Sequence, residues 1–313
     1  MIYVPIPAPE FAKNNDSLGY YNYRSEFTSH LMTFNKRLEE SEKYLGRMGR
    51  ILDIGCVLGH MGEAARRRGW DVYVTDVSEF TVLEARKNFG LNGFISAPDK
   101  LAVKPGRFDL ITMYDMMEHL SHPLDLLKDV RKALSSCGIL HISTSNAQSW
   151  SAKIMGRHWY HLKPSEHLLY FTPETLRSCL ERTGFEVLKI KSICTYMRIN
   201  DILLRLERYS KKGARFLRTI ARTLGISDWR VKIFTGEMQA WAQPAGIRKE
   251  QKTQPVKDIL DIVCCSNCRS EIQLFEESEA ICTQCELSFE VVMGVINFSK
   301  YAKHGKQKVI GSS

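Results

Sequence analysis

Carboxylate and imidazole side chains are concentrated in one short stretch, Asp115-Met116-Met117-Glu118-His119. On a turn after a strand, Asp115 and Glu118 would project to one side, with His119 next to them. Such groups can accept a proton from a substrate or bind a divalent cation. Alternatively, Glu118 caps a helix or forms a salt bridge, and His119 is a structural histidine. The stretch therefore predicts either an acid–base or metal site, or a purely structural turn.

A second candidate site lies in the stretch from Ile51 to His60, where a short apolar run ends in Asp53-Ile54-Gly55 and Gly59 follows. This pattern predicts a strand that turns sharply into a helix. Because glycine has no Cβ, a ligand can lie directly against the backbone of such a turn. Many nucleotide-binding proteins contain this kind of turn, and so do some turns without a ligand. The residues that follow decide its interpretation.

Strands and helices are expected to alternate after this turn. We expect strands at 51–54, 71–75, 94–95, 108–114 and 139–144, helices at 61–68, 78–88 and 123–134, and a turn at 135–138. The alternation predicts an α/β, Rossmann-like, doubly wound sheet with ligands at the carboxyl ends of the strands. Asp76 ends the second strand, where a carboxylate can accept hydrogen bonds from both hydroxyls of a ribose. Val77 would then lie beside an adenine.

Together these motifs resemble those of class I S-adenosylmethionine-dependent methyltransferases. The resemblance rests on Leu52-Asp53-Ile54-Gly55-Cys56-x-x-Gly59, Asp76, Phe108-Asp109-Leu110-Ile111 and Glu118-His119-Leu120. The chain is similar in particular to ubiquinone-pathway and polysaccharide-cluster O-methyltransferases, over about residues 45–190 and more weakly to about 245. The resemblance implies S-adenosylmethionine as cofactor, with contacts from Asp53, Gly55, Cys56, Gly59, Asp76, Val77 and Tyr114. Val57 departs from the pattern, since the family usually has glycine there.

The resemblance also implies a role for the acidic stretch. Ubiquinone-pathway enzymes and small-RNA 2′-O-methyltransferases use a similar Glu-x-x-Glu-His set, with a later histidine in the RNA enzymes, to hold a divalent cation. Asp115, Glu118, His119 and His167 stand at the corresponding positions. A Mg²⁺ or Mn²⁺ ion held there would stabilise the oxyanion of an acceptor. The alternatives are His119 or His167 as a metal-free general base, and the structural turn described above.

Three functions are compatible with this pattern. The first is O-methylation of a small-molecule, glycan or lipid-linked acceptor, and the second is methylation of RNA or tRNA. The third is a non-catalytic binding module that kept the fold but lost turnover, which Val57 would permit. A NAD-linked dehydrogenase is disfavoured because position 57 is not glycine, so the G-x-G-x-x-G fingerprint is absent.

Positive charge collects in an insertion at about residues 196–230, before a last strand expected at 231–242. Its apolar residues recur at helical spacing, which predicts one or two basic amphipathic helices with a break at Gly213. We expect a lid whose apolar stripe packs on the domain and whose basic face captures an anionic acceptor, such as a glycan, a lipid-linked substrate or RNA. Contact with a membrane surface is the alternative.

Two C-x-x-C knuckles, Cys265/Cys268 and Cys282/Cys285, lie near the C-terminus. Each knuckle can supply two thiolates to a tetrahedral ion, so the pattern predicts a zinc ribbon. With four thiolate ligands the zinc would be structural and not catalytic. The segment resembles small zinc-ribbon proteins that partner tRNA and protein methyltransferases. This implies either docking on the catalytic domain or recruitment of a protein partner.

The bulk composition is that of an ordinary globular protein, with 313 residues, 44% of them hydrophobic, and a net charge of +9 that favours anionic partners. No apolar run approaches the roughly 20 residues of a membrane span, and the N-terminus lacks signal-peptide features, so we expect a cytoplasmic protein. Tyr20, Tyr21 and Tyr23 are expected to pack at the domain edge or, alternatively, to cover a bound cofactor. The expected divisions are a lead-in and helix at 1–45, a methyltransferase domain at 46–245, a linker at 246–257, the zinc ribbon at 258–300 and a disordered tail at 301–313.

Overall fold

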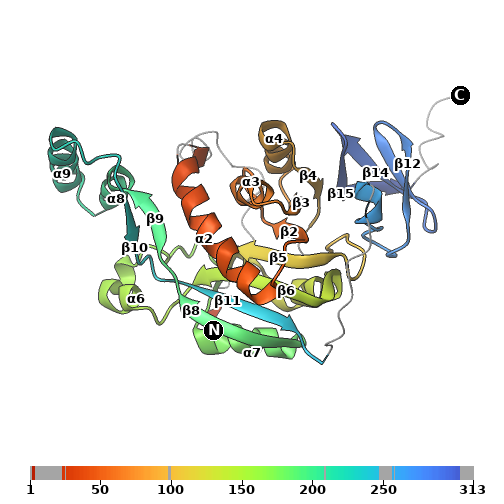
Figure 1. Cartoon of the computed structure of the whole chain (residues 1–313), viewed down its shortest axis with the longest axis horizontal. Coiled ribbons are helices and arrows are strands. Elements are labelled where there is room, and N and C mark those ends of the chain that lie inside the picture. Colours follow the sequence, from red (N-terminus) through yellow and green to blue (C-terminus); the bar gives the residue numbers. More distant parts are fainter. Residues whose placement is uncertain are drawn as a thin grey trace, which may run out of the picture.

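The computed structural model describes residues 2–3, 23–24, 26–97, 100–207, 209–246, 256 and 258–303. Its centre is an 11-stranded sheet in the order β12-β13-β14-β15-β4-β3-β2-β5-β6-β11-β8 (Figure 1). The parallel part consists of β2 (Arg50–Ile54), β3 (Asp71–Asp76), β4 (Asn92–Ile95), β5 (Phe108–Tyr114) and β6 (Leu134–Ser145). β11 (Glu237–Pro244) runs antiparallel between β6 and β8 (Phe185–Ser192).

Helices cover both faces of this sheet. One core lies under α2 (Phe27–Leu45), α3 (His60–Arg67) and α4 (Glu79–Phe89), and the other under α5 (Pro123–Ala133) and α7 (Pro173–Arg182). All five residues of β2 are buried, as expected for a parallel strand that is covered on both faces. This arrangement confirms the doubly wound α/β fold.

Two of the expected boundaries in this domain are wrong. The segment 135–138 is not a turn but part of β6, and a shift in the β5–β6 register accommodates it. The expected last strand is also divided into two. β10 (Arg230–Ile233) pairs with β9 (Thr195–Arg198) in a separate two-stranded sheet, and β11 begins only at Glu237. Glu237 therefore lies at the beginning of the strand that completes the sheet.

The basic insertion contains α8 (Ile199–Leu206) and α9 (Lys211–Thr223), as expected, but its details differ. Ser210 accepts a hydrogen bond from the Gly213 amide and caps α9, so the break precedes Ser210 and does not fall at Gly213. Only Ala214 and Ala221 of α9 are buried. The expectation that the apolar stripe of this helix packs on the domain is therefore wrong.

The cysteine-containing segment forms an antiparallel meander of β12 (Ile272–Glu276), β13 (Glu279–Cys282), β14 (Leu287–Val292) and β15 (Val295–Lys303). Asn297 of β15 pairs in parallel with Ile95 of β4, which continues the central sheet into the meander. Because β15 reaches Lys303, the first residues of the expected tail belong to a strand. The rest of that tail, and the linker positions 247–255 and 257, lie outside the described residues.

The cysteine-containing segment, from Ile262 onward, also packs directly on the α/β domain. Val263 forms a β-bridge with Val103, and the Lys104 amide donates to the Ile262 carbonyl at 2.7 Å. The Arg269 guanidinium forms an ion pair with Asp129 at 2.7 Å. Most of the buried apolar residues of the meander belong to the same core as α5 and α7, so the two parts bury a common apolar surface.

The N-terminal residues contribute one short strand, β1 (Ile2–Tyr3), which pairs with β7 (Leu169–Tyr170). The other residues of the expected lead-in up to Tyr20 lie outside the described part of the chain. Within the described residues, no helix is both long enough and apolar enough to cross a bilayer.

Candidate active site

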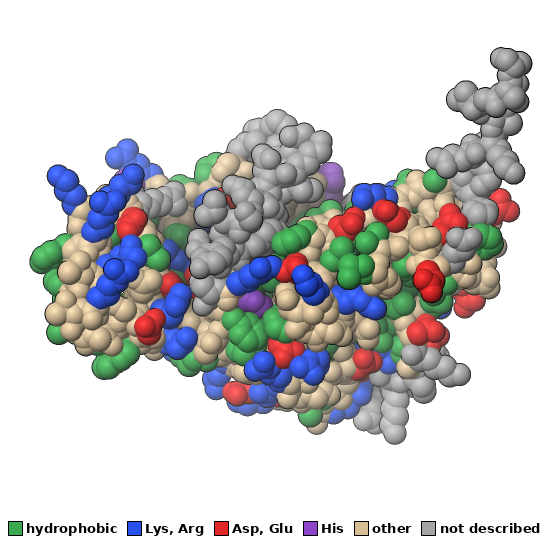
Figure 2. Space-filling view, turned by 90° about the horizontal axis from the view of Figure 1, so that it is seen from above, with side chains coloured by type: hydrophobic (Ala, Val, Ile, Leu, Met, Phe, Trp, Pro, Cys, Tyr) green, Lys and Arg blue, Asp and Glu red, His purple; other side chains and the backbone are tan. Residues whose placement is uncertain are grey.

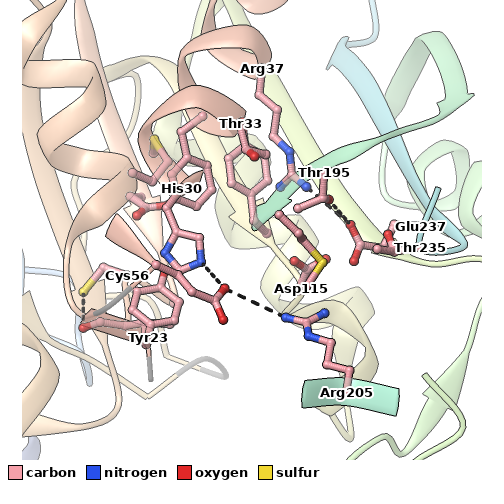
Figure 3. A pocket seen from close by; sticks show the side chains of 18 residues that line it. Tyr23, His30, Thr33, Arg37, Cys56, Asp115, Thr195, Arg205, Thr235 and Glu237 are labelled. Carbon is pink, nitrogen blue, oxygen red and sulfur yellow. Dashed lines mark hydrogen bonds and ion pairs between the residues drawn. The ribbon is translucent and has the colours of Figure 1, made fainter. Parts of the chain in front are cut away.

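A cavity of about 240 Å³ lies at the carboxyl ends of β2 and β5. The glycine turn contributes Asp53, Gly55 and Cys56 to its wall, and the end of β5 contributes Tyr114 and Asp115. Most of the remaining wall comes from α2 and from the segments around β9 and β11, which face the glycine turn across the cavity (Figure 3). Four of the seven predicted cofactor contacts thus line one cavity, at the place that the fold class predicts.

Asp53 is the buried acidic group of this wall. It accepts a hydrogen bond from Thr112 Oγ1 at 2.8 Å. Burial raises the pKa of Asp53 to about 7, although the Thr112 hydrogen bond opposes this shift. A carboxyl group held in this way ionises more readily when a cationic group is bound beside it. Asp53 is therefore suited to the positively charged amino group of a ligand in the cavity.

The other three predicted contacts, Gly59, Asp76 and Val77, do not line the cavity but flank it. A Cβ at Gly59 would lie 2.7 Å from Ala85 Cβ, so glycine is required there for the packing of α3 on α4. The Asp76 carboxylate accepts hydrogen bonds from the amides of Val57 at 3.2 Å and Ser78 at 2.9 Å. Asp76 therefore holds the glycine turn in place, while Val77 is half exposed.

Val57 keeps a glycine-like backbone, with φ of 50°. A β-branched residue in this left-handed region is strained by about 1–2 kcal/mol. Val57→Gly relieves this strain, and the relief offsets the larger chain entropy that glycine gains on unfolding, so we expect the melting temperature to be unchanged or higher. Val77→Gly is the control, because Val77 does not have a positive φ. This substitution should lower the melting temperature. Thermal unfolding of both variants tests this, and equal destabilisation would contradict it.

The acidic stretch divides between the cavity wall and the interior behind it. Asp115 lines the cavity with φ of 52° and accepts a hydrogen bond from Ser143 Oγ at 3.0 Å. Glu118, on the short helix η1 (Met117–His119), is buried and accepts a hydrogen bond from Thr144 Oγ1 at 2.7 Å. Burial, and secondarily the charge of Asp115, raises the pKa of Glu118 to about 8.

Two histidines complete a cluster with Glu118. The His119 and His167 rings lie perpendicular with centroids 4.8 Å apart, and ligand atoms of all three residues lie within 4.8 Å of one another. His119 Nδ1 is 2.8 Å from the Glu166 carbonyl oxygen and must donate to it, which leaves Nε2 unprotonated in the neutral ring. Buried His167 Nδ1 has no hydrogen-bond partner among the described residues, and burial lowers the pKa of His167 to about 3. Asp115, the fourth member of the predicted set, lies outside this group.

Sequence reasoning missed Glu237, which lines the cavity. Its carboxylate lies 3.4 Å from Arg37 Nη2 and 3.6 Å from His161 Nε2. Burial, followed by the charge of Asp115, raises the pKa of Glu237 to about 7, although Arg37 opposes this shift. One feature of the sequence pointed to a buried acidic partner: Arg37 is a charged residue within the apolar stripe of α2, between Phe34 and Leu38.

The N-terminal side of the cavity is closed by Tyr23 and Glu26. The Tyr23 ring stacks on His60 with centroids 4.6 Å apart and lines the cavity, which favours the cofactor-covering alternative for this tyrosine. Tyr20 and Tyr21 lie outside the described residues. Glu26 lies 3.9 Å from Arg205 of α8, so an ion pair joins the two sides of the cavity (Figure 3).

The four predicted zinc ligands also converge. The Sγ atoms of Cys265 and Cys285 are 3.6 Å apart, and those of Cys268 and Cys282 are 3.4 Å apart. Tetrahedral zinc with Zn–S bonds of about 2.3 Å requires sulfur–sulfur distances of roughly 3.8 Å. The amides of Asn267 and Gln284 point to Cys265 Sγ and Cys282 Sγ, both at 3.4 Å, and would stabilise thiolates. The donor set therefore fits a zinc ion.

Comparison with known proteins agrees with this geometry. A methyltransferase-domain family profile matches residues 23–190, which is more than half of the chain, so the chain belongs to that family. It is 29% identical over 164 residues to a ubiquinone biosynthesis O-methyltransferase of Roseobacter denitrificans, with 49% of this chain and 65% of the relative aligned. The same enzyme of Cereibacter sphaeroides is 28% identical over 148 residues, covering 44% and 60%. The chain thus spans somewhat less than two thirds of either relative.

Solved structures support the fold. A magnesium protoporphyrin IX methyltransferase from Synechocystis PCC 6803 with bound SAH matches with a TM-score of 0.52 at 14% identity, covering 75% of this chain and 99% of that one. An S-adenosylmethionine-dependent methyltransferase from Clostridium acetobutylicum matches with a TM-score of 0.51 at 12% identity, covering 74% and 100%. The α/β domain therefore has the fold of S-adenosylmethionine-dependent methyltransferases.

Proposed function

We propose that this protein transfers a methyl group from S-adenosylmethionine to an oxygen atom of an acceptor bound in the cavity. The observation that carries the proposal is the convergence of Asp53, Gly55 and Tyr114 with Asp115 and Glu237 around one cavity at the carboxyl ends of the strands. Similarity to O-methyltransferases supports oxygen as the acceptor atom. Arg37 and Arg205 of the cavity wall are paired with Glu237 and Glu26, so the proposal of an anionic acceptor rests on the basic insertion beside the cavity.

When bound, S-adenosylmethionine supplies a methyl group on a positively charged sulfur, which keeps the electrons of the broken carbon–sulfur bond. We propose that Asp53 binds its amino group and that the backbone at Gly55 and Cys56 lies against it. The acceptor hydroxyl must lose its proton as its oxygen bonds to the methyl carbon. Glu237 is suited to accept this proton, because burial brings its pKa close to neutral pH.

We further propose two metal roles. Cys265, Cys268, Cys282 and Cys285 would hold a structural zinc ion, as the sulfur distances permit. Glu118, His119 and His167 would hold a divalent cation such as Mg²⁺ or Mn²⁺, and the buried, unpartnered His167 Nδ1 supports this assignment. None of these three residues lines the cavity, so a cation there would be held behind the cavity wall, next to Asp115 in the sequence. Methylation of RNA is the second candidate function, because the basic insertion borders the cavity through Arg205.

Transfer of a labelled methyl group from S-adenosylmethionine into fractionated lysate tests this proposal. We expect label in a glycan, lipid-linked or small-molecule fraction, and label confined to RNA would establish the second candidate. The assay should use protein that carries one equivalent of zinc. It should be run once with added Mg²⁺ or Mn²⁺ and once without. Activity that does not respond to the added cation would contradict the cation site, and no label in any fraction together with no calorimetric binding of S-adenosylmethionine would contradict the enzyme.

A further inference from the structure

Helix α9 exposes an apolar stripe that no described part of the protein covers. Phe216, Ile220 and Leu224 follow one another at intervals of four residues and so lie on one side of the helix. The side chains of Phe216 and Leu224 are 66% and 65% exposed, and Leu217 beside them is 44% exposed. Ala214 and Ala221 face the protein instead. A stripe of large apolar side chains in solvent indicates a surface that binds a partner.

Basic side chains accompany this stripe. Lys211, Lys212, Arg215 and Arg222 of α9 are exposed and form no ion pair with any residue that the structure describes. The nearby acidic groups are already paired, since Glu207 binds Arg218 and Asp201 binds Arg198. Figure 2 shows Lys and Arg side chains gathered at the end of the molecule where α8 and α9 lie in Figure 1. The partner of α9 should therefore be anionic as well as apolar.

An apolar cavity of about 160 Å³ lies beneath the same insertion. It is lined by residues of α8, of α6 (Trp150–Met155) and of the segment around β10, and it shares Met197, Arg205 and Thr235 with the larger cavity. Phe234 borders it and is 73% exposed. The lining of this smaller cavity thus lies between the basic insertion and the cavity of the proposed active site.

We propose that α9 docks this protein on the surface of a membrane that contains anionic lipids. A helix with an apolar stripe and a basic flank lies in the plane of the lipid headgroups, its apolar side chains inserted and its cations beside the phosphates. RNA would explain the cations but not an exposed aliphatic stripe, because single-strand binding surfaces place aromatic rings between their basic residues. This docking goes beyond the proposed methyl transfer and does not require it.

Sedimentation with lipid vesicles tests the proposal on the full, zinc-loaded chain. We expect binding to vesicles of equal parts phosphatidylglycerol and phosphatidylcholine, little binding to pure phosphatidylcholine, and weaker binding as salt increases. The F216S/L224S double variant should lower the partition coefficient about tenfold or more. The R215E/R222E double variant should abolish the preference for phosphatidylglycerol.

The matched control is the L274S/F275S double variant on β12. These two residues are 53% and 61% exposed but belong to the zinc-ribbon segment at the opposite end of the molecule (Figure 1). It should bind vesicles as the unmodified chain does. Three outcomes would overturn the proposal: no sedimentation with anionic vesicles, equal loss of binding in the control, or salt-sensitive binding to RNA without binding to vesicles.

Discussion

Glu237→Gln is expected to slow methyl transfer by about 10²–10⁴-fold, the usual contribution of a positioned general base. Glutamine has nearly the same shape and can still accept a hydrogen bond from Arg37, but it cannot take up the acceptor proton. The binding of S-adenosylmethionine should therefore survive, since the predicted contacts at Asp53 and Gly55 lie on the other side of the cavity. Rates measured with saturating S-adenosylmethionine, together with calorimetric affinities, separate the two effects.

The pH dependence distinguishes this role from a structural one. Burial raises the pKa of Glu237 to about 7, so at lower pH the carboxyl group is protonated and cannot act as a base. With S-adenosylmethionine saturating, so that its amino group keeps Asp53 ionised, kcat/KM for the acceptor should therefore rise with pH, about tenfold per unit below pH 7, and level off above it. The Glu237→Gln variant should lack this rise.

Glu40→Gln provides the matched control. Glu40 accepts a hydrogen bond from Gln239 on the same strand, β11, but is not part of the cavity wall. This substitution should leave the rate and its pH profile unchanged. If Glu237→Gln keeps the unmodified pH profile and a rate within a few-fold of normal, Glu237 is not the base.

The sequence alone predicted the part of the cavity wall that is formed by residues close together in the chain. Asp53, Gly55 and Cys56 are neighbours in one strand–turn segment, and Tyr114 and Asp115 end the adjacent strand. Apolar runs and glycines specify such segments without long-range information. The sequence did not predict the role of Asp76 in the turn. Its carboxylate accepts a hydrogen bond from the Val57 amide, a contact that only the structure shows.

Two features could not be predicted: the position of Glu237 in the cavity, and the packing of the zinc-ribbon segment (residues 258–303) on the α/β domain. Each depends on contacts between segments that are distant in the sequence. Glu237 enters the cavity only because β11 inserts between β6 and β8. The ribbon joins the sheet through a single parallel pair, Asn297 with Ile95, which leaves no periodic signal in the sequence. For α9, the spacing of apolar residues predicted the helix, but spacing does not reveal whether a stripe is covered.

Removing the proposed zinc is expected to lower the melting temperature of the whole chain by about 10 °C or more. Four-thiolate zinc sites contribute several kcal/mol or more to folding, and each kcal/mol corresponds to roughly 2–4 °C in a chain of this size. Cys268→Ser should reproduce the loss, because it removes one of the four ligands. Cys137→Ser, which replaces an exposed thiol outside the cluster, should not. Metal analysis should find one zinc per chain in the unmodified protein and less in Cys268→Ser.

The shape of the unfolding transition tests whether the ribbon is part of the catalytic domain or only attached to it. Ile262 and Val263 are completely buried in the core shared with α5 and α7, and β15 covers the β4 edge of the sheet. Loss of the ribbon would expose that core and leave β4 as an unprotected edge strand. Calorimetry should therefore show one transition with zinc, and a lower transition for the methyltransferase domain without it. Two transitions, of which the larger is unaffected by zinc, would mean that the ribbon folds independently of the domain it contacts.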